Sequence, residues 1–105
     1  MPKLCFASPR DLPVAHPQTG VTERTLRSRD ATLLFIDLEA RTVIDTHRHD
    51  EERVGVITRG SVAMAISGET RILTEGDTFV VPAGAAHGIR VLERGAQVVE
   101  ARRTA

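Results

Sequence analysis

The sequence predicts an all-β domain, a small sandwich or barrel of about eight short strands. From residue 31 onward, short runs rich in β-branched and apolar residues follow one another at regular spacing. Turn-forming segments separate these runs, and no window carries a 3.6-residue apolar period long enough for a helix. The turns are Arg59-Gly60, Ser67-Gly68, Glu75-Gly76-Asp77, Pro82-Ala83-Gly84 and Arg94-Gly95. A chain of 105 residues has room for one such core.

The expected strands can be placed in chain order. They cover residues 31–38, 42–47, 53–58, 61–67, 70–74, 78–81, 88–92 and 96–101. The two runs that flank Ser67-Gly68 are typical of a tight hairpin, because glycine tolerates a positive φ. A jelly-roll or barrel arrangement accommodates this number of short strands.

Residues 1–30 differ from the rest of the chain and contain four of its five prolines. Proline argues against a continuous helix or a central strand, although residues 21–26 suit an edge strand. The segment is interpreted either as an arm that lies on a surface, such as that of a partner subunit, or as a poorly ordered terminus. We therefore divide the chain into an N-terminal arm, 1–30, and a barrel, 31–105.

Charge and composition exclude several classes of function. The chain has 14 basic and 14 acidic residues, whereas a nucleic-acid-binding protein needs a basic excess. Only 3% of residues are aromatic, so a stacking surface is not expected. No apolar run suits a membrane span or a signal peptide, and the single cysteine, Cys5, cannot form an internal disulfide. We expect a cytoplasmic protein, and the zero net charge does little to resist self-association.

Three of the four histidines carry the main chemical signal. His47 and His49 are two residues apart, so a strand would project both imidazoles from one face. His87 follows the Pro82-Ala83-Gly84 turn, which a barrel can bring beside the pair. Three neutral imidazoles suit zinc, iron, copper or nickel. Without His87, the pair would be more typical of an exposed turn next to the acidic residues 50–52.

Two segments resemble the paired motifs of the cupin family. The first contains His47-Arg48-His49 and ends at Gly60; the second runs from Gly76 through Pro82-Ala83-Gly84 to His87. The match covers about residues 31–101. The resemblance implies a double-stranded β-helix, or jelly-roll barrel, with His47, His49 and His87 holding a divalent metal (Zn, Fe, Ni, Mn or Cu) in its mouth. It also implies homodimers built by sheet packing and swapped terminal strands.

The chain departs from the cupin pattern at the position of the usual metal-binding glutamate. Arg53 stands there, seven residues before Gly60. Arginine stays protonated and is not a normal metal ligand. Three outcomes follow. The three histidines alone hold the metal and Arg53 pairs with an anionic substrate, or a one-residue bulge makes Glu52 the fourth ligand. In the third outcome, the metal is weakly held or lost. Arg53 could instead be an inward arginine neutralised by Glu51 or Glu52.

The resemblance implies a metal-dependent protein that acts on a small anionic organic molecule, as a sugar-acid or carboxylate isomerase, lyase or dioxygenase. The Glu52-Arg53-Val54-Gly55 stretch resembles small cupins of uronate and sugar-acid metabolism. Glu52 is then the nearest candidate general base. The alternatives are a non-catalytic ligand-binding or sensing cupin, and a structural dimer with a degenerate metal site.

Five further residues have less specific interpretations. Asp45 shares strand parity with His47, so it either orients an imidazole or is solvated. Met64 and Phe35 suit pocket walls or core filling, and His16 and Cys5 are expected at the surface without a chemical role.

Overall fold

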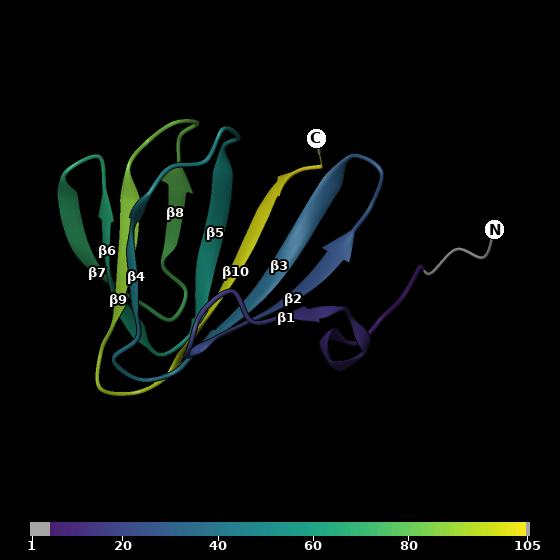
Figure 1. Ribbon diagram of the computed structural model, residues 1–105, viewed down its shortest axis with the longest axis horizontal. Helices are drawn as coiled ribbons and strands as arrows, with labels where there is room; N and C mark the ends of the chain where they lie inside the picture. Colours follow the sequence, from purple (N-terminus) through teal and green to yellow (C-terminus); the bar gives the residue numbers. More distant parts are fainter. Residues whose placement is uncertain (1–4, 105) are drawn as a thin grey trace.

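The protein folds into two antiparallel β-sheets that face each other (Figure 1). The structure is a computed structural model, and it describes residues 5–104. The larger sheet has the order β1 (Val14–Ala15), β2 (Val21–Arg27), β3 (Ala31–Leu38), β10 (Ala96–Arg103), β5 (Arg53–Arg59) and β8 (Thr78–Val81). The smaller sheet has the order β4 (Val43–His47), β9 (His87–Val91), β6 (Ser61–Ile66) and β7 (Glu69–Thr74).

The helical content of residues 5–104 is the single 3-10 turn η1 (Pro9–Asp11). Within the same range, no helix has the length and apolar character needed to cross a bilayer. The all-β prediction is therefore confirmed.

Alternating burial along the central strands of the larger sheet defines its inner face. In β3 the alternate residues Thr32, Leu34, Ile36 and Leu38 are buried. Side chains alternate between the two faces of a strand, so these residues lie on the inner face. Together with inward residues of the smaller sheet, such as Val62, they form the apolar core between the sheets.

The β6–β7 connection confirms the predicted hairpin. Ile66 pairs with Glu69, which leaves Ser67 and Gly68 as a two-residue turn. Both have positive φ, 50° and 86°, as the tight turn that matches strand twist requires.

The edge position expected for residues 21–26 is wrong. These residues do form a strand, β2, but Val14 and Ala15 pair with Arg24 and Glu23 and make β1 the edge. A two-residue strand between prolines leaves no alternating pattern in the sequence. Within the described part of the N-terminal arm, residues 5–11 are exposed, and Gln18 bonds to β4 of the same chain. Residues 1–4 lie outside the described residues.

Candidate metal centre

The pairing of β4 with β9 brings the two histidine motifs together. His47, the last residue of β4, is the register partner of His87, the first residue of β9. Their ring centroids lie 4.2 Å apart, and the ring of His49 lies 4.6 Å from that of His47 and 4.8 Å from that of His87. One ring nitrogen from each histidine falls within 4.8 Å of the other two.

One main-chain and one side-chain hydrogen bond tie the His49 segment to the turn that precedes His87. The Gly84 N–H donates to the carbonyl oxygen of His49 at 2.7 Å. In return, Nη1 of Arg48 donates to the carbonyl oxygen of Gly84 at 2.7 Å. The segment beyond β4 is therefore fixed although it is not part of a strand.

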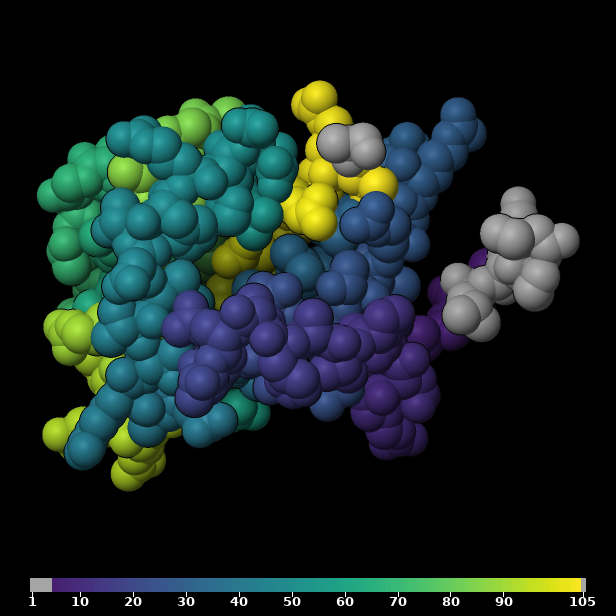
Figure 2. Space-filling model, viewed as in Figure 1, coloured from purple at the N-terminus to yellow at the C-terminus, as the bar shows by residue number. Residues whose placement is uncertain are grey.

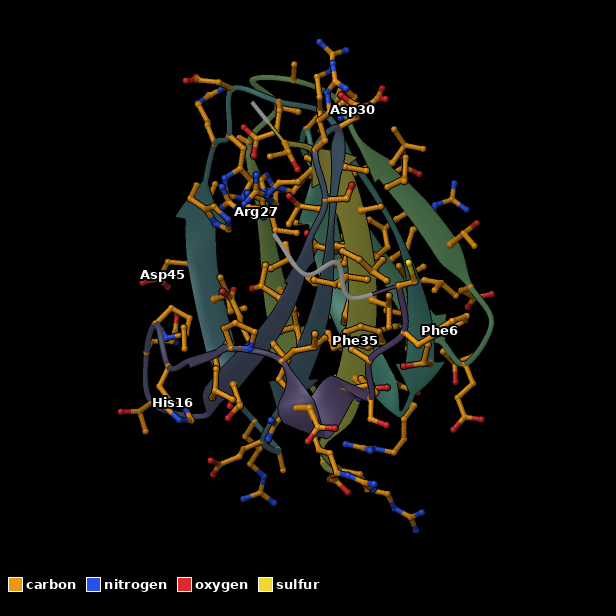
Figure 3. All side chains as sticks on the ribbon, turned by 90° about the vertical axis from the view of Figure 1, so that its right-hand side faces the viewer. Phe6, His16, Arg27, Asp30, Phe35 and Asp45 are labelled. Atoms are coloured by element: carbon orange, nitrogen blue, oxygen red, sulfur yellow. The ribbon has the colours of Figure 1, made fainter. Side chains whose placement is uncertain are left out.

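Two of the imidazoles are oriented by carbonyl groups two residues earlier in the chain. Nδ1 of His47 lies 2.8 Å from the carbonyl oxygen of Asp45, and Nδ1 of His87 lies 2.9 Å from that of Ala85. An Nδ1–H that donates to a carbonyl leaves the Nε2 lone pair free to bind a metal. Asp45 thus orients an imidazole through its main chain, while its side chain points away from the ribbon (Figure 3).

The surroundings of His49 and His87 favour the neutral imidazole, which is the state that binds a metal. The pKa of His49 is lowered to about 4, mainly by burial and then by the positive charges of Arg53, His47 and His87, in that order. Burial also lowers the pKa of His87, against a smaller opposing effect of its bond to Ala85.

The donor set fits a divalent transition metal. Nε2 of His47 and Nε2 of His49 lie 3.0 Å apart. Two ring nitrogens on one tetrahedral zinc ion, at 2.0–2.1 Å each, lie about 3.3 Å from each other. The observed separation of these two nitrogens is therefore close to the one that a shared metal requires.

The histidines line a cavity of about 410 Å³ between the two sheets. Figure 2 shows the hollow between the chain around β4 and the chain around β2 and β3, with β10 in yellow on its floor. Its walls combine apolar side chains, including Ile36, Ile44 and Val98, with a few charged ones. This volume and lining are typical of a site for a small organic molecule.

The N-terminal segment closes one side of this cavity. Pro17, Gln18, Val21 and Glu23 all contribute to the lining. Nε2 of Gln18 donates to the carbonyl oxygen of Val43 at 2.9 Å, and so links the loop before β2 to β4 of the opposite sheet. Part of the predicted arm therefore belongs to the site of its own chain.

Arg53 lines the same cavity and is held by two carboxylates. Its Nη2 and Nε lie 2.9 and 3.3 Å from Oε1 of Glu51, and its Nη1 lies 3.4 Å from Oε1 of Glu100. Of the two neutralising partners considered from the sequence, the structure places Glu51 in contact with Arg53. Glu52 is exposed and lines a different cavity at the rim.

Glu100 is the residue that sequence reasoning missed. It lies on the inner face of β10 and lines the histidine cavity, with only 8% of its surface exposed. Burial raises the pKa of Glu100, although Arg53 acts in the opposite direction. The sequence did contain a sign of this residue. In the alternating positions 96, 98 and 100, a glutamate stands where the pattern places a buried apolar residue.

The remaining expected residues lie away from the centre. Met64 is buried in the core, whereas Phe35 is half-buried on the outer face of the larger sheet. His16 is exposed, with Nδ1 3.3 Å from Oγ1 of Thr22, and Cys5 is exposed with a free thiol.

Comparison with known proteins decides the family. A family model described as a cupin domain matches residues 34–99, more than half of the chain. The chain belongs to the cupin family. A curated relative of this cupin is the pectin degradation protein KdgF of Dickeya dadantii, 28% identical over 83 residues, which are 77% of this chain and 76% of that protein.

Solved structures confirm the cupin jelly roll. KdgF from Halomonas sp. matches with a TM-score of 0.88 at 21% identity, covering 98% of this cupin and 96% of that chain. An RmlC-like cupin from Shewanella frigidimarina matches with a TM-score of 0.88 at 19% identity, covering 98% and 93%. Oxalate decarboxylase from Bacillus subtilis, studied for its Mn(II) centers, matches with a TM-score of 0.80 at 24% identity, covering 92% of this cupin but 28% of that chain.

Proposed function

We propose that this cupin binds one divalent transition metal and converts a small carboxylate-bearing organic molecule, a sugar acid, by isomerisation or by a lyase reaction. The observation that carries the proposal is the convergence of three histidine nitrogens within 4.8 Å on a cavity that also contains Arg53 and Glu100. The pectin degradation named for its relative supports a sugar-acid substrate, because pectin is a polymer of uronic acids.

His47, His49 and His87 would hold the metal, whose chemistry is that of a Lewis acid that polarises a substrate oxygen. The hydrogen bonds from Nδ1 to the carbonyls of Asp45 and Ala85 keep two of the imidazoles in the metal-binding orientation. Imidazole ligands suit zinc, iron, nickel and copper, and the Mn(II) centers of a cupin of the same fold support manganese.

Glu100 is the group placed to move a proton. Its carboxyl group lies in the cavity, and burial raises its pKa toward the range in which a carboxyl can both accept and donate a proton. The apolar side chains around it exclude water and strengthen its interaction with a bound molecule. Glu52, the base suggested by the sequence, would need its loop to turn inward.

The metal assignment is tested by removing ligands. His47→Ala and His87→Ala are expected to lose the metal that the purified wild type retains, measured by inductively coupled plasma mass spectrometry. His16→Ala is the matched control, since His16 is an exposed histidine on the N-terminal segment. Normal metal content in either of the first two variants contradicts the assignment. Tight ligand binding without product in a screen of sugar acids would favour a sensing protein over an enzyme.

We further propose that the protein is a cytoplasmic homodimer. The supporting feature is an apolar row that crosses the outer face of the larger sheet in register. It consists of Leu26, Leu33, Ala101, Val54 and Val80 on five neighbouring strands. Leu26, Val54 and Val80 are 41%, 43% and 52% exposed. A second copy of the sheet is the occupant that would cover this row, and the lone cysteine suits a reducing compartment.

A further inference from the structure

A row of arginines crosses the inner face of the larger sheet near the histidines. Arg27 pairs with Thr32, Thr32 pairs with Arg102, and Arg102 pairs with Arg53. Thr32 is buried and Arg53 lines the histidine cavity, which places the row on the inner face. Arg102 and Arg53 thus lie on neighbouring positions of this face, and Thr32 separates them from Arg27.

Arg53 and Arg102 are directly opposite each other on β5 and β10. Like charges in this arrangement repel and destabilise the pair of strands unless an anion lies between them. One oxygen of Glu51 serves both: Oε1 lies 2.9 Å from Nη2 of Arg53 and 4.0 Å from Nε of Arg102. Glu51 belongs to the loop between β4 and β5, not to the sheet.

Arg102 has a donor that Glu51 does not satisfy. Its Nε is buried, and among residues 5–104 it is the buried side-chain nitrogen or oxygen that lacks a hydrogen-bond partner. A buried donor without an acceptor is unfavourable. A ligand that brings a second acceptor oxygen to the Nε of Arg102 would therefore be bound favourably. Arg102 borders a rim cavity of about 860 Å³, whereas Arg53 borders the histidine cavity, and Glu51 contacts both arginines.

We propose that Arg53 and Arg102 form a carboxylate-binding site at the entrance to the histidine cavity, and that Glu51 is an intramolecular carboxylate that the substrate displaces. A carboxylate has two acceptor oxygens and binds guanidinium groups through both. The substrate carboxylate would accept from Nε of Arg102 and from the Arg53 N–H groups that now donate to Glu51. The rest of the substrate would then extend toward the histidines. The choice of a sugar acid rests on the proposed function.

Binding of D-galacturonate tests this site, with D-galactose as the neutral comparison. Glu51→Gln is expected to bind galacturonate about tenfold more tightly than the wild type, because the competing charge is removed. Arg102→Gln is expected to bind it about tenfold more weakly. Asp50→Asn is the matched control: it makes the same charge change on the same loop, and its affinity should equal that of the wild type. Galactose binding should not respond to any of these changes.

The measurements are isothermal titration calorimetry and, in the wild type, the NMR resonance of the Arg102 Nε–H, which should shift on titration with galacturonate but not with galactose. This resonance decides the question if a variant does not fold. Equal affinities of Glu51→Gln and Asp50→Asn, or an unmoved Arg102 resonance, overturn the proposal.

All titrations are repeated after chelator treatment. If the protein holds no metal but binds galacturonate, the metal proposal is wrong and the carboxylate site is retained. If the protein holds metal but the changes at Glu51 and Arg102 have no effect on binding, only the carboxylate site is wrong. The two failures are therefore distinguishable.

Discussion

At the scale of single residues, the three carboxylates near Arg53 differ in burial and therefore in their environment. Glu100 lies inside the cavity and its pKa is raised by burial, whereas Glu52 is exposed at the rim. Glu51 is bound to Arg53, and that hydrogen bond is the largest cause of its lowered pKa. Of these three carboxylates, Glu100 is the one that we propose for proton transfer.

We predict that Glu100→Gln lowers the turnover of a sugar acid found in the substrate screen by about 100-fold or more, a typical loss for a missing acid–base group. The change is isosteric and keeps an acceptor for Arg53, so metal content should stay normal. Steady-state kinetics on Glu100→Gln and Glu52→Gln, with metal content measured in parallel, check the prediction. A large loss in Glu52→Gln with little loss in Glu100→Gln would instead identify the base suggested by the sequence.

At the scale of elements, the two faces of the larger sheet differ in the residues that they carry. Its inner face carries the core and the arginine row, and its outer face carries the apolar row from Leu26 to Val80. The adjacent outer positions Phe35, Val99 and Val56 widen this apolar row across β3, β10 and β5. An exposed apolar surface on a sheet is typical of an interface.

Replacing Leu33 by Glu, in the middle of the apolar row, is expected to turn a dimer into a monomer, because association would bury a charge without a partner. Light scattering coupled to size-exclusion chromatography measures the mass. Ile72→Glu is the control: Ile72 is 59% exposed and lies on β7 of the other sheet. Dissociation by Ile72→Glu, or a monomeric wild type at high micromolar concentration, contradicts the proposed interface.

Local patterns predicted the elements well, because strand alternation and turn residues act over a few positions. The Ser67-Gly68 hairpin and the β8 bounds, 78–81, follow from such signals. The proximity of the three histidines could be predicted from the spacing of the two motifs. The partners of Arg53 were less accessible: Glu100 lies 47 residues away in the chain and meets Arg53 only through the β5–β10 register. β1 was missed because two residues are too short to alternate.

At the scale of the whole molecule, the histidine cluster affects stability through protonation. The pKa of His49 falls from 6.5 to about 4 on folding, first through burial and then through Arg53 and the other two histidines. Between these two pH values the unfolded chain binds a proton that the folded, metal-free protein does not. Stability must therefore decrease as the pH falls through this interval, and it is fully present above pH 6.5.

We predict that chelator-treated protein has a lower melting temperature at pH 4.5 than at pH 7, as measured by circular dichroism. His49→Asn should reduce this difference without removing it, since the pKa of His87 is lowered as well. Glu100 acts in the opposite direction, because its pKa is raised. His16→Asn, at an exposed histidine outside the cavity, is the matched control. An unchanged pH dependence in His49→Asn would show that His49 is not the group responsible.

The pairing of His47 with His87 also sets the time at which a metal can be captured. The two side chains are 40 positions apart, and they meet only when β9 docks on β4. Contacts this distant in sequence close late, since the chain must lose loop entropy before they form. During synthesis, no ion can be bound by all three histidines until residue 87 has left the ribosome. Loading of the proposed metal would therefore be a late event in folding, which follows the docking of β9 on β4.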